Sequence, residues 1–178
     1  PVVSGQYAAA GEFIAAGQRL AGNGVAAIIT TCGFLVRHQD ELAGALPVPV
    51  ETSTLLHYAA LQRGLGDDKR VAILTIDAAA LGPDVRAAAG IDRDALVFSL
   101  PATSHFVSAI LDARCALDVQ RAEAEWVKLA LDVQRHHPQL GMWLFECANM
   151  PLYADAVRRA TGLPVFDALS MGRRLYAR

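Results

Sequence analysis

The stretch IITTCGF, residues 28–34, is an apolar run that ends at Cys32 and leads into a helical pattern. The stretch WLFECAN, residues 143–149, repeats this arrangement around Cys147 in the second half of the chain. An apolar run without polar alternation is typical of a parallel strand that is covered on both faces. Open α/β sheets bind ligands at the carboxyl ends of such strands. We therefore expect both thiols to lie at one sheet edge, facing a single small substrate.

Strand patterns alternate with helical patterns along the rest of the chain. We expect strands at residues 25–31, 47–51, 71–76, 96–100, 141–146 and 163–167. We expect helices at residues 7–21, 33–45, 53–64, 78–89, 118–136, 150–161 and 169–176, whereas residues 102–117 show no clear pattern. This alternation predicts an α/β fold with mostly parallel sheets flanked by helices.

The two halves of the chain follow one plan. In each half a helix leads through glycine to a strand, a cysteine, a second helix and then Leu-Pro-Val, at residues 46–48 and 163–165. An architectural repeat of this kind predicts two pseudo-symmetric lobes with the active site in the cleft between them. We expect one lobe to contain about residues 1–65 and 165–178, and the other about residues 66–164.

The composition narrows the classes of protein that the chain can belong to. It has 178 residues, 53% of them hydrophobic, a net charge of −2 and three cysteines. The length favours one domain, and mixed charges without a basic stripe argue against a nucleic-acid partner. No run reaches the roughly 20 apolar residues of a membrane span, and free thiols fit a reducing cytoplasm. We expect a cytoplasmic protein that binds neither nucleic acid nor membrane.

Several motifs resemble those of the aspartate/glutamate/hydantoin racemase superfamily. They are TTCGFL (residues 30–35), ECANMP (146–151), LPV (46–48), TGLPVFD (161–167) and the strand VAILT (71–75). The resemblance extends from about Gly11 to Tyr176. It implies a racemase or epimerase without a cofactor, in which Cys32 and Cys147 act as acid and base at the carbon α to the carboxylate of a small molecule. Because the superfamily is often dimeric, the resemblance also allows a homodimer.

The same resemblance indicates which residues contact the substrate. They adjoin the cysteines or end a strand at the same sheet edge: Thr31, Gly33, Phe34, Thr75, Ala148 and Asn149. Many members carry Cys-Asn-Thr at the first motif, whereas here the apolar Phe34 would narrow the pocket and backbone N–H groups would bind the substrate. Members also open with a strand and a substrate-binding loop, and residues 1–6 are too short for that strand, so we expect it to be missing.

The proposed chemistry makes demands on the thiols. A proton α to a carboxylate is a very weak acid, so its removal needs a desolvated base and a stabilised enediolate. Both cysteines precede helical patterns, whose first N–H groups favour a thiolate and bind carboxylates. Glu146 adjoins Cys147, but strand alternation predicts that its side chain points to the opposite face. Cys115 has no comparable setting and is expected to be structural or exposed, and the histidines lack metal-ligand spacing, so no metal is expected.

Three alternatives to racemisation stay open. A maleate isomerase-like reaction would keep both cysteines. Arylmalonate decarboxylase-like members keep only the second cysteine, so the presence of Cys32 argues against that reaction. The alternative from another class of protein is an inactive homologue that binds small acids.

Overall fold

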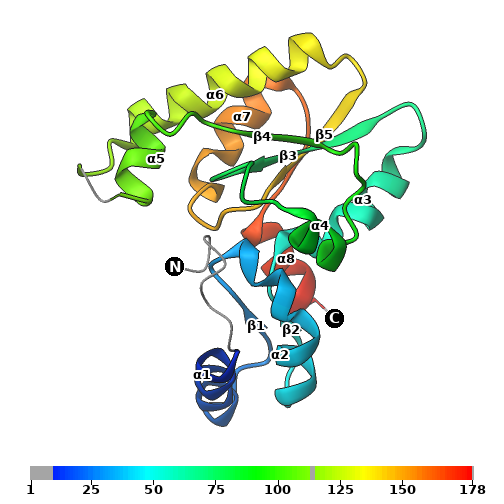
Figure 1. The fold of residues 1–178 in the computed structure, drawn as a ribbon, viewed down its shortest axis with the longest axis vertical. Helices are drawn as coiled ribbons and strands as arrows, with labels where there is room; N and C mark the ends of the chain where they lie inside the picture. The colour runs from blue at the N-terminus through cyan, green and yellow to red at the C-terminus, as the bar shows by residue number, and fades with distance from the viewer. Residues whose placement is uncertain (1–9, 113–114, 178) are drawn as a thin grey trace.

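Two parallel sheets organise the computed structural model, which describes residues 10–112 and 115–177 (Figure 1). The small sheet pairs two short strands, β1 (Ile28–Ile29) and β2 (Val50–Glu51). The large sheet has the order β4 (Leu96–Ser99), β3 (Arg70–Thr75), β5 (Leu140–Phe145) and β6 (Val165–Phe166). Each of these neighbouring pairs is parallel. The predicted α/β class with parallel sheets and flanking helices is therefore confirmed.

Helices cover both faces of the large sheet (Figure 1). One face carries α6 (Val119–His136) and α7 (Ala154–Thr161), and α5 (His105–Ile110) packs against α6. The other face carries α3 (Tyr58–Leu65) and α4 (Pro83–Ala89). Because helices cover both sides, the strands between them can be apolar throughout.

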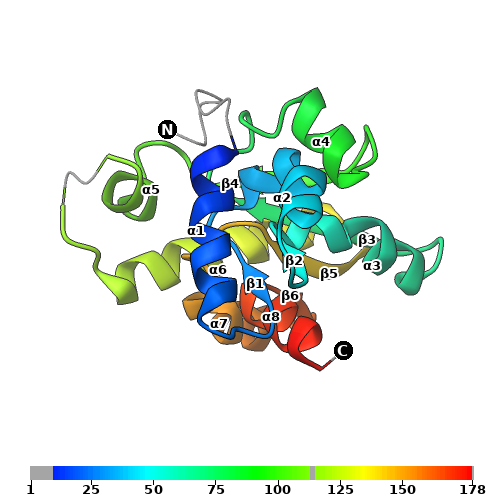
Figure 2. The same cartoon turned by 90° about the horizontal axis from the view of Figure 1, so that it is seen from below.

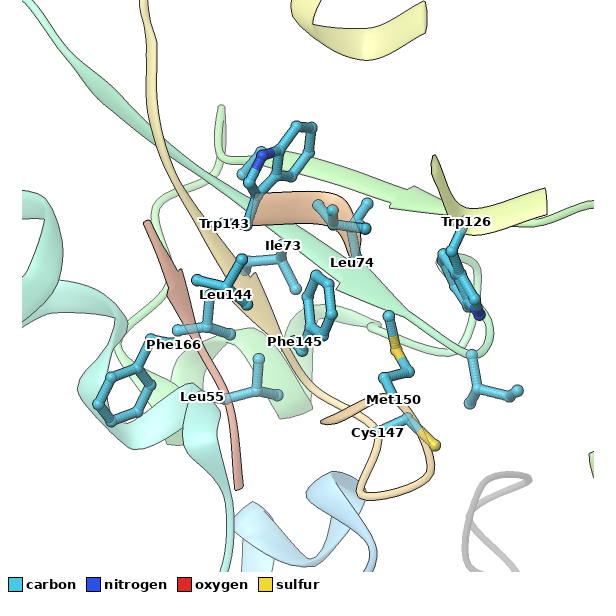
Figure 3. Close-up of a cluster of buried hydrophobic side chains, with 14 of the residues drawn as sticks. Leu55, Ile73, Leu74, Trp126, Trp143, Leu144, Phe145, Cys147, Met150 and Phe166 are labelled. Atoms are coloured by element: carbon cyan, nitrogen blue, oxygen red, sulfur yellow. The ribbon is translucent and has the colours of Figure 1, made fainter. Parts of the chain in front are cut away.

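The central strands β3 and β5 form the core of this larger lobe. Ile73, Leu74, Trp143 and Leu144 are fully buried, although successive residues of a strand point to opposite faces (Figure 3). This burial on both faces is what the non-alternating apolar runs predicted.

The smaller lobe lies at the carboxyl ends of the large sheet's strands (Figures 1 and 2). It contains α1 (Gly11–Gly22), α2 (Gln39–Ala45) and the small sheet, with its own apolar cluster around Ile28, Leu42 and Val50. The last helix, α8 (Ala168–Tyr176), returns to this lobe. The backbone of Gly172 approaches the side chain of Ile29 so closely that a Cβ there would lie 3.5 Å from it.

Three 3-10 segments, η2 (Gly33–His38), η3 (Thr54–His57) and η4 (Pro151–Tyr153), precede α2, α3 and α7. The sequence predicted single α-helices in these places. The predicted helix at residues 78–89 begins only at Pro83, whose fixed φ suits the first turn of a helix. The strand predicted at residues 25–31 is paired only over two residues, because β2 offers only two partners. Residues 7–9 of the first predicted helix lie outside the described residues.

The lobe boundaries differ from those suggested by the sequence repeat. Residues 58–65 and 165–166 were assigned to the first lobe. Helix α3 packs instead against β3, and β6 pairs with β5, so both belong with the large sheet. Among the described helices, none is long and apolar enough to cross a membrane.

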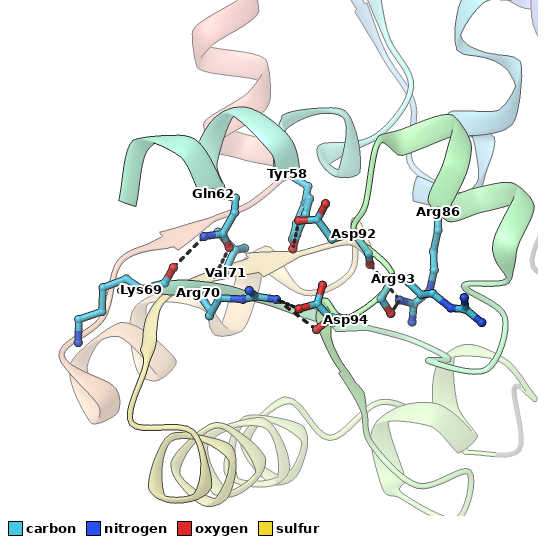
Figure 4. Close-up of polar contacts among 9 residues, drawn as sticks. All are labelled: Tyr58, Gln62, Lys69, Arg70, Val71, Arg86, Asp92, Arg93 and Asp94. Atoms are coloured by element: carbon cyan, nitrogen blue, oxygen red, sulfur yellow. Dashed lines mark hydrogen bonds and ion pairs between the residues drawn. The ribbon is translucent and has the colours of Figure 1, made fainter. Parts of the chain in front are cut away.

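Polar contacts hold the amino-terminal end of β3 (Figure 4). The Gln62 side chain donates to the Lys69 carbonyl (2.7 Å) and accepts from the Val71 N–H (2.9 Å). The ladder between β3 and β5 is irregular at this point, between Arg70 and Val71. The guanidinium of Arg70 also pairs with Asp94 at 2.7 Å. Gln62 therefore satisfies backbone groups where the strand pairing is interrupted.

Gln62→Ala is expected to destabilise the protein by roughly 1–3 kcal/mol, because two backbone groups lose their side-chain partner. The matched control is Gln18→Ala on the exposed side of α1, which should change the stability by less than about 0.5 kcal/mol. Urea unfolding followed by circular dichroism measures both. Equal stabilities for the two variants would show that Gln62 does not stabilise this end of the strand.

Candidate active site

Cys32 and Cys147 each follow the carboxyl end of a strand, but in different lobes. Cys32 comes after β1 and immediately before η2, where it is half-buried. Cys147 lies on the loop after β5, buried beside Met150 at the border of the core (Figure 3). Gly33, directly after Cys32, meets Glu146, directly before Cys147, so closely that a Cβ at Gly33 would lie 2.2 Å from Oε1 of Glu146. The fold thus brings the two predicted catalytic residues into one neighbourhood.

Burial dominates the ionisation of both thiols. It raises the pKa of Cys147 to about 12, assisted by the charge of Glu146, although a backbone N–H and the side chain of Asn149 favour the thiolate. Burial also raises the pKa of Cys32, where the N–H of Phe34 and the charge of Arg37 act in the opposite direction. The predicted effect of the helix starts is therefore present, but desolvation outweighs it.

Glu146, the first residue of the second cysteine motif, is buried against the turn that contains Cys32. Its carboxylate accepts the Thr75 hydroxyl at 2.8 Å and the backbone N–H groups of Ile76 and Gly33. Burial nevertheless raises its pKa to about 7. Strand alternation suggested a side chain directed away from the site, whereas its charge acts on both Cys32 and Cys147. That expectation was wrong, because the carboxylate reaches the turn that contains Cys32.

The close approach of the Glu146 carboxylate leaves no room for a side chain at position 33, so this residue is glycine. A Cβ at Gly33 would lie 2.2 Å from Oε1 of Glu146, far inside van der Waals contact. The N–H of Gly33 was expected to bind the substrate, but in this structure it donates to Glu146. The acidic residue directly after a buried strand, together with the glycine after the other cysteine, was the sequence signal for this contact.

The remaining predicted substrate contacts differ in exposure. Thr31 and Asn149 are exposed and Ala148 is half-buried, so a ligand can reach them. Thr75 is fully buried, and its hydroxyl is engaged by Glu146. Phe34 is also buried, as part of the apolar core. A direct contact of these two side chains with substrate stays a prediction that would require the site to rearrange.

An apolar pocket of about 370 Å³ adjoins Cys32. Helix α1, strand β1 and helix α2 line it, and Thr30, Thr31 and Cys32 lie along one part of its wall. Cys147 is not among its lining residues. The pocket therefore belongs to the smaller lobe and offers apolar contact to a group bound near Cys32.

Contacts within the large sheet and across the lobe boundary fix the end of β5 before Cys147. The hydroxyl of Thr54 on η3 donates to the Phe145 carbonyl at 2.8 Å, and both groups are buried. The Glu146 N–H donates to the Leu74 carbonyl at 2.9 Å. On the surface, Arg37 of η2 pairs with Asp84 of α4 at 3.0 Å. The site therefore forms where η3 and the carboxyl ends of β3 and β5 are bonded to one another.

Cys115 is exposed, as one of the two sequence-based alternatives predicted. Its sulfur lies 3.7 Å from Nδ1 of His105, and Nε2 of His105 lies 2.7 Å from the Asp118 backbone nitrogen. Because Nε2 accepts that N–H, Nδ1 carries the ring proton of the neutral imidazole and points it at the sulfur. Across the described part of the chain, no group of three or more His, Cys, Asp or Glu side chains is placed to hold a metal ion.

Solved structures with this fold include a decarboxylase and a racemase. A mutant of arylmalonate decarboxylase aligns with 99% of this chain and 78% of its own, with a TM-score of 0.65 and 19% identity. Allantoin racemase from Pseudomonas fluorescens aligns with 85% of this chain and 60% of its own, with a TM-score of 0.60 and 18% identity. The chain therefore shares the fold of these two enzymes, which is the fold that the sequence motifs implied.

Sequence relatives carry a different name. Dimethylsulfoniopropionate lyase from Durusdinium sp. clade D is 32% identical over 151 residues, which are 82% of this chain and 50% of the relative. Dimethylsulfoniopropionate lyase 3 from Emiliania huxleyi (strain CCMP1516) is 30% identical over 168 residues, 89% of this chain and 44% of the relative. This chain thus spans about half the length of the curated relatives it matches. A scan against protein-family models found no match.

In the protein without substrate, Cys115 is expected to react fastest with iodoacetamide at neutral pH. Cys115 is exposed, whereas burial raises the pKa of both Cys32 and Cys147 and leaves Cys147 almost inaccessible. Mass spectrometry of tryptic peptides after timed alkylation gives the three rates. Faster labelling of Cys147 than of Cys115 would contradict the burial described for the site.

Glu146→Gln should change how stability depends on pH. Because the folded-state pKa of Glu146 lies near 7, above its ordinary value near 4.5, the carboxyl group favours the folded state below pH 4.5. This stabilisation is lost as the pH rises towards 7. Relative to Gln, wild-type should lose on the order of 3 kcal/mol of unfolding free energy over that range. Urea unfolding of both proteins at several pH values between 4 and 8 measures the difference, and a constant difference would contradict the raised pKa.

Proposed function

We propose that the protein is an enzyme which removes a proton from the carbon α to the carboxylate of a small molecule, without a cofactor. The observation that carries the proposal is the contact between the two cysteine motifs, in which Gly33, directly after Cys32, meets the carboxylate of Glu146, directly before Cys147. A racemase and a lyase can share this first step, because each then forms a carbanion beside a carboxylate. The fate of that carbanion decides the class of reaction.

Cys32 is the better candidate for the base. It is less buried than Cys147, and the positive charge of Arg37 favours its thiolate. The pKa of Cys147 is about 12, so this thiol stays protonated near neutral pH. The pair thus offers one group that can accept a proton and one that can donate a proton, as general acid–base catalysis requires.

The lyase names of the sequence relatives favour β-elimination as the second step. In dimethylsulfoniopropionate, removal of the α proton by the Cys32 thiolate leaves an electron pair on the α carbon. That pair forms the new carbon–carbon double bond while the bond from the β carbon to the sulfonium sulfur breaks. Dimethyl sulfide leaves with the electrons of that bond, acrylate remains, and Cys32 keeps the proton until solvent removes it.

Racemisation is the second candidate, and the fold favours it through neighbours such as allantoin racemase. In this reaction Cys147 returns a proton to the opposite face of the same carbon. The two candidates make different demands on Cys147, because elimination needs only the base, whereas racemisation needs a donor on the other side. An arylmalonate decarboxylase-like or maleate isomerase-like reaction, or small-acid binding without turnover, is the outcome if neither product forms.

The test incubates the purified protein in deuterated water with dimethylsulfoniopropionate and, separately, with a panel of enantiopure amino acids, allantoin and hydantoins. Gas chromatography detects dimethyl sulfide, and NMR and chiral chromatography detect α-deuteration and inversion. Elimination should fall by about 10²–10⁴-fold in Cys32→Ser, because a hydroxyl is a far poorer base. Cys147→Ser should reduce elimination less, but should abolish racemisation.

Cys115→Ser is the matched control and should keep the wild-type rate, because Cys115 lies on the exposed surface. Wild-type turnover in Cys32→Ser would exclude this residue as the base. Neither deuteration nor product with any of these compounds would count against the enzyme and favour the binding protein.

A further inference from the structure

The acid–base chemistry proposed above leaves the fully buried carboxylate of Glu146 without a role. Glu146 belongs to the larger lobe and directly precedes Cys147. Two of its hydrogen-bond donors, Thr75 and Ile76, lie at the end of β3 in the same lobe. The third donor, the N–H of Gly33, lies across the lobe boundary and directly follows Cys32. The carboxylate of Glu146 therefore contacts the turn that contains Cys32. The backbone of the same residue leads directly into Cys147.

The contact between Glu146 and Gly33 is too close to tolerate a side chain. A Cβ at Gly33 would lie 2.2 Å from Oε1 and 2.7 Å from Cγ of Glu146. The carboxylate cannot easily yield, because the Thr75 hydroxyl and the Ile76 N–H bind it from the other side. The turn that contains Cys32 is thus seated directly on a side chain that is itself fixed to the large sheet.

We propose that Glu146 is a positioning residue, which seats the Cys32 turn on the ends of β3 and β5 and thereby fixes the spacing of the two thiols. Its importance for turnover rests on the proposed function, but its effect on the thiols does not. The role differs from acid–base catalysis because the carboxylate acts through Cys32 and Cys147 and needs no contact with substrate.

The negative charge of Glu146 provides a second effect by which this role can be recognised. Glu146 opposes ionisation of both thiols, whereas Arg37 on η2 favours ionisation of Cys32. Asp77, the next carboxylate along the segment that follows β3, accepts the N–H of Ala79 at 2.9 Å. Removing the charge of Glu146 should therefore make both thiols ionise at lower pH. A side chain that only filled space would have no such effect.

The first experiment uses Glu146→Gln in a Cys115→Ser background, with iodoacetamide as the probe and no substrate. The rates of Cys32 and Cys147 alkylation are measured between pH 6 and 10. We expect both profiles to move to lower pH, with on the order of tenfold faster alkylation near pH 8, the factor for a pKa change of one unit. Unchanged profiles in a folded variant would overturn the electrostatic part of the proposal.

The second experiment tests the seating of the turn from the opposite side. Gly33→Ala should push the turn away from Glu146 and speed up alkylation of Cys32 several-fold. Adding Glu146→Asp, which shortens the side chain by one methylene, should bring that rate back towards wild-type. The matched control is Gly44→Ala in α2, where a Cβ meets nothing within 4 Å and the rate should not change.

The double variant is the decisive measurement, because residues in contact show non-additive effects, whereas the effects of distant, independent residues add. Additive effects of Gly33→Ala and Glu146→Asp on the alkylation rate would overturn the proposed contact. Circular dichroism melting confirms which variants are folded, and the Gly33 series gives an answer even if Glu146→Gln does not fold. Because no experiment uses a substrate, these results are independent of whether a lyase or racemase activity is found.

Discussion

The parallel pairing of β3 with β5 is the interaction on which the rest of the structure depends. Both strands are covered on both faces, so their ladder runs through the middle of the core and carries β4 and β6 on its two edges. Because parallel strands end at the same edge of a sheet, this pairing brings Thr75 beside Glu146 and presents Cys147 towards the smaller lobe. Bonds from Thr54 and Gly33 then attach that lobe to the same edge.

Much of this arrangement could be predicted from the sequence, because apolar runs without alternation identify strands covered on both faces. The runs before Cys32 and Cys147 correctly placed both thiols after strands. The role of Glu146 could not be predicted in the same way. Alternation assigns a side chain to one face of a strand, but it does not show what that side chain meets beyond the edge of the sheet. The contact with Gly33 is also non-local, because it depends on how two lobes pack.

Two opposing effects act on each thiol, and their relative size decides the state of the site. Backbone N–H groups at the start of η2 and after Cys147 favour the thiolate, as the sequence suggested. Desolvation and the neighbouring carboxylate favour the thiol, and burial in this core is the larger effect. Chemistry that needs a thiolate therefore depends on charges brought near the site. The charge of Arg37 acts on Cys32 in this way.

The return of α8 to the smaller lobe has a consequence for the order in which the protein folds. A two-stranded sheet such as that of β1 and β2 is at best marginally stable alone. Its outer strand meets α8, and its thiol turn meets Glu146, both of which lie late in the chain. The apolar cluster of α1, β1, α2 and β2 is local in sequence and can form as soon as these elements have been synthesised. The turn that carries Cys32 reaches its final position only later, when β5 and Glu146 have been added.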